Sequence, residues 1–184
     1  MTISLPLVSK IKILTGKIPD FDNIKKHVIE SIDRSADVQK HKTNLKCKMT
    51  TWHMHEHDLY FKKIAEHVKC HVETYQRKAY RTVHNITVTE CWGAHYTKTD
   101  RAIKHSHYPA LWSGVAYIQS PNKSSPTVFP ECKYSHAPTE GTYIIFPGWL
   151  KHYVENGSDD RYVCAFNMRA LNTKDGRRKK NNSN

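Results

Sequence analysis

The sequence lacks the features of disulfide-bonded, zinc-stabilised and membrane proteins, so its fold should depend on a hydrophobic core. Its five cysteines, an odd number, include no Cys-x-x-Cys pair, which argues against a disulfide framework and against a thiolate zinc site. No apolar run approaches transmembrane length, and the start, MTISLPLVSKIKIL, lacks the basic region and cleavage site of a secretory signal. We therefore expect a cytoplasmic protein with reduced thiols and no membrane partner.

Acidic residues are scarce. Seventeen of them stand against 29 lysines and arginines, which gives a formal net charge of +12. This balance favours an anionic partner, such as a nucleic acid, or simply a solvated basic surface. The C-terminal stretch 172–184 is basic and polar throughout, and we expect it to be a disordered tail. In contrast, 13 histidines and 10 tyrosines are many for 184 residues, which favours a site built on imidazole.

The length predicts one domain over residues 1–184 whose character changes near residue 80. Residues 1–80 are predicted to be an N-terminal arm and supporting helices, with a strand or extended arm over residues 1–18. Residues 81–171 carry short runs rich in β-branched and aromatic residues, separated by Pro, Gly, Asn and Ser. Short strands at this spacing indicate a β-sandwich or barrel rather than a parallel α/β sheet.

Two helices are predicted in the first part, near residues 20–34 and 57–80. Asp20 or Asp22 can cap the first of them. The stretch 36–51 between them is polar and basic without a period, which predicts a loop. The apolar positions recur with helical spacing at Ile24, Val28 and Ile32, and at Phe61, Ile64, Ala65, Val68, Val72, Tyr75 and Ala79.

The candidate site combines two segments, KHSHYPALWSGVAYI and IIFPGWLKHYVENGSDDRY. His105 and His107 are two residues apart, so in a strand they point to one face, and His152 leaves another strand-like run. Three such ligands leave coordination positions open, as a non-haem iron oxygenase requires. Arg161 begins the next strand and can pair with a carboxylate through two hydrogen bonds. Taken singly, these residues also fit surface histidines and a salt bridge from Arg161 to Asp159 or Asp160.

Two other groups of histidines could in principle bind a metal. His53, His55 and His57 alternate in WHMHEHD, but this polar stretch leads into a helix and favours ordinary loop histidines over a second metal site. His67 and His71 are four residues apart on the long predicted helix, which suits zinc. Because both flank its apolar stripe, we favour partial burial against the sheet.

The two segments together, with HSHYPALWSGVAYI followed by PTEGTYIIFPGWLKHYVENGSDDRYVCAFN, resemble the 2-oxoglutarate and iron(II)-dependent oxygenases of the double-stranded β-helix class. The likeness is greatest to a small uncharacterised group common in marine bacteriophages and covers about residues 80–171. It implies a mainly β fold, a jelly roll or cupin-like double-stranded β-helix, with flanking helices. If the protein is phage-encoded, its location is the host cell cytoplasm.

The resemblance also assigns roles. His105 matches the first metal ligand, His152 the distal histidine, and Arg161 the residue that binds the far carboxylate of 2-oxoglutarate. His107 departs from the family, because it stands where a carboxylate ligand is usual. No catalytic residue beyond the metal ligands is expected. By strand position, Ser113, Tyr117 and Asn167 are candidates for the cosubstrate pocket and Trp92 and Tyr96 for the substrate pocket, while for Phe146 we favour core packing.

The resemblance implies a dioxygenase that uses Fe(II), 2-oxoglutarate and O2 to hydroxylate a peptidyl or small-molecule substrate. His107 leaves open a three-histidine dioxygenase that does not use 2-oxoglutarate. A third reading, supported by the net charge and the basic tail, is a non-catalytic cupin-like module that binds a metal or nucleic acid.

Overall fold

The computed structural model describes residues 11–38, 43–80, 85–121, 124–155 and 160–171. The predicted tail over residues 172–184 and the first part of the predicted arm lie outside these ranges. The described chain is mainly β with flanking helices, as expected, and its strands form two antiparallel sheets. The elements in chain order are β1 (Leu14–Lys17), α1 (Phe21–Ser35), β2 (Asp37–Val38), β3 (Leu45–Lys46), β4 (Lys48–Met49), α2 (Met54–His57), α3 (Leu59–Tyr80), β5 (Ile86–Tyr96), β6 (Arg101–His105), β7 (Trp112–Gln119), β8 (Thr127–Phe129), a 3-10 turn (Pro130–Cys132), β9 (Tyr134–His136), β10 (Thr142–Pro147), β11 (His152–Val154) and β12 (Arg161–Ala170).

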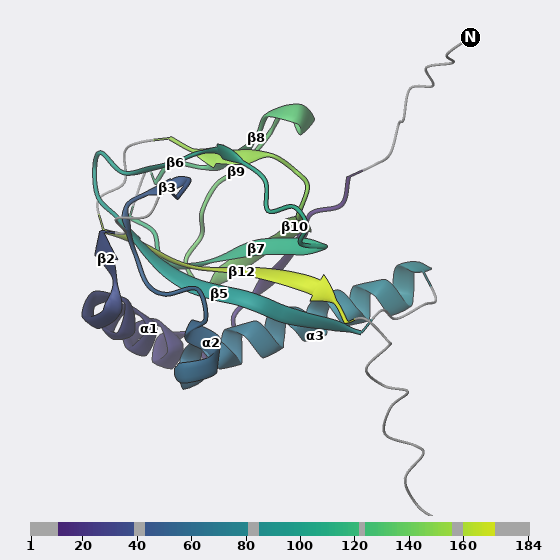
Figure 1. Ribbon diagram of the computed structural model, residues 1–184, viewed down its shortest axis with the longest axis horizontal. Coiled ribbons are helices and arrows are strands. Elements are labelled where there is room, and N and C mark those ends of the chain that lie inside the picture. Colours follow the sequence, from purple (N-terminus) through teal and green to yellow (C-terminus); the bar gives the residue numbers. More distant parts are fainter. Residues whose placement is uncertain (1–10, 39–42, 81–84, 122–123, 156–159, 172–184) are drawn as a thin grey trace, which may run out of the picture.

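Seven strands form the larger sheet, in the order β1-β10-β7-β12-β5-β4-β2. The helices cover one face of this sheet, and the smaller sheet lies over the other (Figure 1). The smaller sheet has the order β3-β6-β11-β8-β9. Because side chains alternate along a strand, each strand of the larger sheet sends one set of residues toward the helices and the other into the space between the sheets.

The apolar stripes of α1 and α3 pack on the outer face of the larger sheet, as their spacing predicts. Ile24, Val28 and Ile32 of α1 are buried there, with Phe61 of α3. The helices approach the sheet so closely that β5 needs a glycine. A Cβ on Gly93 would lie 2.4 Å from Cγ1 of Ile32 and 3.0 Å from Cζ of Phe61.

A second apolar cluster fills the space between the two sheets. It includes Tyr96 of β5, Tyr117 of β7, Phe129 of β8 and Phe146 of β10, all 5% exposed or less. The rings of Phe129 and Phe146 meet edge to face, with their centroids 5.0 Å apart. This inter-sheet core is interrupted at one end by polar side chains, which form the site described below.

Two local predictions differ from the structure. Asp20 stands at the N-cap of α1, but its backbone is left-handed (φ 49°) and its side chain makes no cap bond. Its carboxylate instead accepts a hydrogen bond from Asn23 at 2.9 Å. The stretch 36–51 is not simply a loop, because it contributes the short strands β2, β3 and β4, which extend the edges of both sheets. A strand of only two residues is too short to show the alternation of apolar and polar residues by which strands are predicted.

The long helix begins with a cap that the sequence reading overlooked. Asp58 Oδ1 accepts hydrogen bonds from the backbone N–H groups of Tyr60 at 2.8 Å and Phe61 at 3.2 Å. The hydroxyl of Ser31 donates to the other carboxylate oxygen at 2.6 Å, which ties α1 to the start of α3. Neither helix, nor any other in the described ranges, is long and apolar enough to cross a membrane.

Candidate active site

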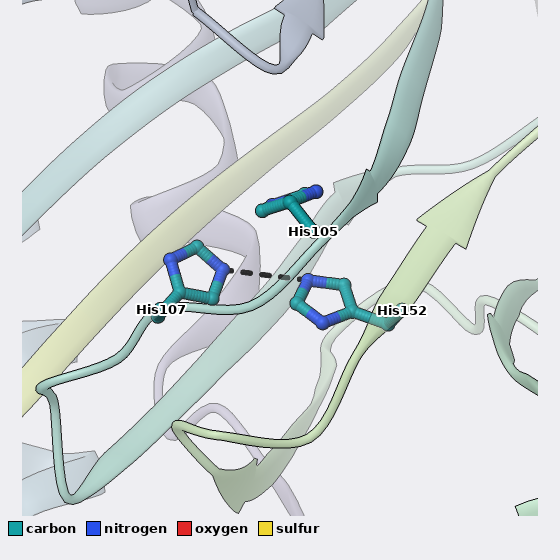
Figure 2. Close-up of side chains that lie close together, drawn as sticks. All are labelled: His105, His107 and His152. Atoms are coloured by element: carbon teal, nitrogen blue, oxygen red, sulfur yellow. Dashed lines mark hydrogen bonds between the residues drawn. The ribbon is translucent and has the colours of Figure 1, made fainter. Parts of the chain in front are cut away.

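Three histidines converge in the space between the sheets (Figure 2). His105 ends β6 and His152 begins β11, and their Cα atoms are directly paired across these antiparallel strands. His107 lies just after β6, where its backbone N–H donates to the carbonyl of Gly148 at 2.7 Å. One nitrogen from each ring lies within 4.8 Å of the other two. The sequence prediction that these residues meet therefore agrees with the geometry.

Backbone carbonyls fix the orientation of two of the rings. Nδ1 of His105 lies 2.6 Å from the carbonyl of Ile103, and Nδ1 of His152 lies 3.1 Å from that of Leu150. A carbonyl only accepts, so each Nδ1 carries the proton and each Nε2 presents a lone pair, as in metal-binding histidines. Nε2 of His107 is 3.4 Å from Nε2 of His152. Two nitrogens bound to one ion at about 2.1 Å lie about 3.0–3.4 Å apart.

Burial keeps these imidazoles neutral. It lowers the pKa of His105, and it lowers the pKa of His152 to about 3. The pKa of His107 is depressed well below its usual value, first by burial and then by the neighbouring histidines. Neutral imidazole is the form that binds a metal, so protons do not compete with the ion at neutral pH. Among the described residues, no other group of three or more His, Cys, Asp or Glu side chains converges in this way.

Arg161 is the most unusual buried side chain. It is 2% exposed at the start of β12 and its Nη1 donates to the carbonyl of Ser125 at 2.7 Å. Its guanidinium carbon lies 5.5 Å from the centre of the Tyr96 ring and 5.7 Å from that of Tyr117. Its Nε has no hydrogen-bond partner within the described ranges. No described carboxylate lies within 4.0 Å of the guanidinium, and Asp160 instead contacts His95. Asp159, the other predicted partner, lies outside the described residues.

The ionisable groups around Arg161 do not neutralise it. Burial raises the pKa of Cys47 to about 12 and that of Tyr117 to about 12, and it raises the pKa of Tyr96 well above its usual range. All three are therefore uncharged at neutral pH. A buried charge without a counter-charge costs several kcal/mol, on the order of what an anion bound at the guanidinium would recover. Arg161 is therefore a candidate for binding an anion in this cavity.

A cavity with a volume of about 50 Å³, which opens to solvent, is lined by the three histidines and by Arg161. Trp92 and Tyr96 line it from one face of β5. Trp92 has its ring 5.9 Å from that of His107, whereas Tyr96 lies against Arg161. These two positions are four residues apart, or about 13 Å along a strand, so the cavity can hold a small elongated molecule between the two polar ends.

The remaining predicted pocket residues divide into two groups. Phe146 lines the cavity beside His152, with ring centroids 4.7 Å apart, and is also core, as expected. Ser113, Tyr117 and Asn167 are buried but do not line the cavity. Tyr117 supports Arg161 from behind and shares a 3.1 Å hydrogen bond with Thr127, while the hydroxyl of Ser113 donates to Asn167 Oδ1 at 2.6 Å.

The other histidines have structural partners. His67 and His71 both contact the hydroxyl of Tyr143, at 3.3 Å and 2.9 Å, which agrees with partial burial of this helix face against β10. His53, His55 and His57 do not form a convergent group. The WHMHEHD segment nevertheless lies near the site, because Trp52 packs edge-on against Trp92 at 4.8 Å. The sequence carried no signal for this contact, nor for Ser125 at the arginine.

No protein-family model matches the sequence. No curated protein matches it either. Solved structures do match. The viral collagen prolyl hydroxylase of Paramecium bursaria Chlorella virus-1, in its 2-oxoglutarate complex, is 15% identical, with a TM-score of 0.67 over 86% of this chain and 96% of that chain.

Two bacterial structures give similar values. A Pseudomonas putida prolyl-4-hydroxylase is 12% identical, with a TM-score of 0.69 over 88% of this chain and 94% of that chain. HygX from Streptomyces hygroscopicus, solved with nickel and 2-oxoglutarate, is 11% identical, with a TM-score of 0.63 over 88% of this chain and 84% of that chain. Identities this low establish the fold rather than the activity. The chain therefore has the double-stranded β-helix fold of 2-oxoglutarate and iron(II) oxygenases.

Proposed function

We propose that the protein is a non-haem Fe(II) and 2-oxoglutarate-dependent dioxygenase that hydroxylates a peptidyl or small-molecule substrate. The observation that carries this proposal is the uncompensated guanidinium of Arg161, which shares one cavity with three convergent imidazoles. A metal alone would explain the histidines. A small molecule that binds the metal at one end and carries a carboxylate at the other explains both the histidines and Arg161. 2-Oxoglutarate is such a molecule.

The residues present fit both groups. His105, His107 and His152 offer three nitrogen ligands, a set that suits iron among other transition metals. Arg161 has an unpartnered Nε and a free positive charge to receive the far carboxylate. The rings of Tyr96 and Tyr117 both lie close to the guanidinium. Ser113 and Asn167 remain candidates for support of the pocket floor rather than for direct contact.

Iron(II) with 2-oxoglutarate supplies the activation of O2 and the hydroxylation of a C–H bond, with succinate and carbon dioxide as coproducts. The chain's own residues bind and orient. Arg161 would bind the far carboxylate of the cosubstrate, and the imidazoles would hold the metal at the other end of the cavity. Trp92, Ala94 and Val163 form apolar walls that exclude water from the space between.

His107 supports a second candidate within the same class of chemistry. It stands where the family has a carboxylate, so the ligand set carries one negative charge fewer, which suits a three-histidine dioxygenase that does not use 2-oxoglutarate. Such an enzyme would have no use for a buried cation without a counter-charge in the same cavity. Arg161 therefore favours the first candidate.

Two of the neighbours described above are prolyl hydroxylases, which favours a peptidyl substrate. We propose that residues 1–184 act as a single domain, with residues 81–171 carrying the site. The likeness to a bacteriophage group, and with it the host cytoplasm as location, remains a prediction from the sequence.

Consumption of 2-oxoglutarate tests the proposal. The full chain, supplied with Fe(II), ascorbate, O2 and 2-oxoglutarate, should form succinate, and Arg161→Met should abolish this at equal protein and metal content. A protein that binds Fe(II) but neither binds 2-oxoglutarate nor forms succinate with any candidate substrate would instead be a three-histidine dioxygenase or a metal-binding module.

A further inference from the structure

A β-bulge in β5 separates Glu90, on the inner face of the strand, from Val88, which packs on the helix side. Asn167 of β12 pairs with Glu90, whereas the next residue, Met168, pairs with Val88, so Thr89 is an extra residue without a partner. Val88 and Met168 contact the helix-side core. On the Trp92 side of the bulge the alternation is regular, so Glu90 lies on the same face of β5 as Trp92 and next to that residue's part of the cavity wall, without lining the cavity itself.

Glu90 lies past the histidines, on the side away from Arg161. Along β5 the inner-face residues run Tyr96, Ala94, Trp92, Glu90, with Tyr96 at the guanidinium and Trp92 near His107. Successive members of this row are about 6.6 Å apart. In the proposed function, 2-oxoglutarate occupies the stretch from the histidines to Arg161. Glu90 therefore borders the side left for the substrate.

The carboxylate is held in place but not neutralised. Asn167 Nδ2 donates to one oxygen of Glu90, and the hydroxyl of Ser113 orients that amide through a 2.6 Å hydrogen bond to Asn167 Oδ1. Both supporting side chains are at least 95% buried. Within the described ranges no Lys, Arg or His nitrogen lies within 4.0 Å of Glu90, although the protein carries an excess of basic residues.

A second polar group beside Glu90 also lacks a partner. The indole N–H of Trp92 is buried and makes no hydrogen bond to any described residue. An unpaired buried donor costs about 1–3 kcal/mol, so a ligand acceptor is the natural explanation. Trp92 is 2% exposed and lines the cavity. Trp52 meets it edge-on, and the Trp52 carbonyl accepts the backbone N–H of Cys91 at 2.7 Å, which pins this second indole to β5.

We propose that Glu90 is a specificity-determining residue that selects a substrate with a cationic group, an ammonium or a guanidinium, close to the C–H bond that is oxidised. This inference rests on the proposed function, because it takes the histidines and Arg161 as the metal and cosubstrate ends of the site. A half-buried carboxylate on the same strand face as the Trp92 indole can bind a cation by ion pairing and by hydrogen bonds, and the indole ring can add a cation–π contact. The same substrate's carbonyl can accept the Trp92 N–H.

The charge can be tested separately from the shape. The probes are N-acetyl-lysine amide, N-acetyl-arginine amide and N-acetyl-norleucine amide, the last of which has an uncharged side chain of similar length to lysine. Binding is measured by saturation-transfer NMR and calorimetry on the full chain loaded with Zn(II) and 2-oxoglutarate, which does not turn over. We expect at least one cationic probe to bind about 10-fold or more tightly than the norleucine amide.

Three variants test whether Glu90 causes the preference for a cationic probe. Glu90→Gln, which keeps the shape and the hydrogen bond from Asn167, should remove the preference for the cation. Glu90→Asp keeps the charge and should retain most of the preference. Glu73→Gln is the matched control, because Glu73 is on α3 and contacts only Lys69 among the salt bridges described. Melting temperatures of the variants confirm that each is folded.

Several results would overturn the inference. Equal binding of the norleucine and cationic probes, binding of none of them, or an unchanged preference in Glu90→Gln would each show that Glu90 does not select a cation. The proposed function is judged independently, by 2-oxoglutarate binding to the metal-loaded protein without any probe. If 2-oxoglutarate binds and cations do not, the oxygenase proposal stands and only the substrate class is wrong.

Discussion

Nε2 of His107 and Nε2 of His152 lie 3.4 Å apart, although 45 positions separate the two residues in the chain. His152 is placed by its pairing with His105 across β6 and β11, whereas His107 is placed by the hydrogen bond from its backbone to Gly148. Two unrelated backbone contacts thus bring the lone pairs to one point. Preorganisation of this kind is expected of a metal site. If the residues had only a structural role, apolar side chains would stabilise this buried position better than three imidazoles.

Removal of one of these imidazoles should abolish metal binding. We expect His152→Ala to weaken binding of Fe(II), measured anaerobically by calorimetry, by more than about 100-fold, because only two ligands remain. His57→Ala, on the exposed side of α2, is the control and should leave the affinity unchanged. Equal losses in both variants would place the metal elsewhere.

His107→Asp restores the carboxylate that the family usually has. The variant should keep Fe(II) bound and tighten it, because the charge of the ligand set becomes more negative. Metal content after dialysis against a weak chelator is a suitable measurement. A metal-free His107→Asp protein with an unchanged melting temperature would show that a side chain at this position cannot reach the ion.

The sequence pointed to the three histidines and to Arg161, but the reason given for His107 was wrong. The spacing predicted His105 and His107 on one face of a single strand, whereas β6 ends at His105 and His107 is held beyond it by the hydrogen bond to Gly148. The alternation of side chains along β5 places Glu90 on the inner face with Trp92. What the sequence could not show is the hydrogen bond that Glu90 accepts from Asn167, because that residue lies 77 positions away on β12.

The cap of α3 should contribute measurably to stability. Asp58→Ala removes the hydrogen bonds to the backbone of Tyr60 and Phe61 and the bond from Ser31, so we expect a loss of about 1–2 kcal/mol in the free energy of unfolding. Glu66→Ala, exposed in the same helix, should change it by less than about 0.5 kcal/mol. Urea denaturation compares them. An Asp58→Ala protein as stable as the control would mean that the cap is not formed in solution.

The close approach of α1 to β5 predicts a steric effect at Gly93. Gly93→Ala should destabilise the protein by about 1–3 kcal/mol, because the new methyl group would overlap Ile32. In the double variant with Ile32→Ala, the combined loss should be smaller than the sum of the single losses, since the shortened side chain makes room. Strictly additive losses would contradict this packing.

The helix predictions succeeded and failed for separate physical reasons. The buried stripe of α3 follows the predicted 3.6-residue period from Phe61 to Val72, because burial selects apolar residues at that spacing. Near its end the prediction was wrong, since Ala79 is exposed and Gln76 is buried instead. Asp20 looked like a cap but adopts a left-handed backbone, where its carboxylate faces Asn23 instead of the free amides. The strands β2, β3 and β4 are two residues long and owe their conformation to neighbours distant in sequence.

The central claim is that Arg161 holds the far carboxylate of 2-oxoglutarate while the histidines hold the metal. The direct measurement is 2-oxoglutarate affinity, by calorimetry on anaerobic Fe(II)-loaded protein, for the unaltered chain, Arg161→Met and the control Arg169→Met, which changes an exposed arginine of the same strand. We expect Arg161→Met to bind 2-oxoglutarate about 10- to 100-fold more weakly with Fe(II) affinity unchanged, and the control to behave like the unaltered chain. Unaltered 2-oxoglutarate affinity in Arg161→Met, or a parallel loss of the metal, would contradict the account.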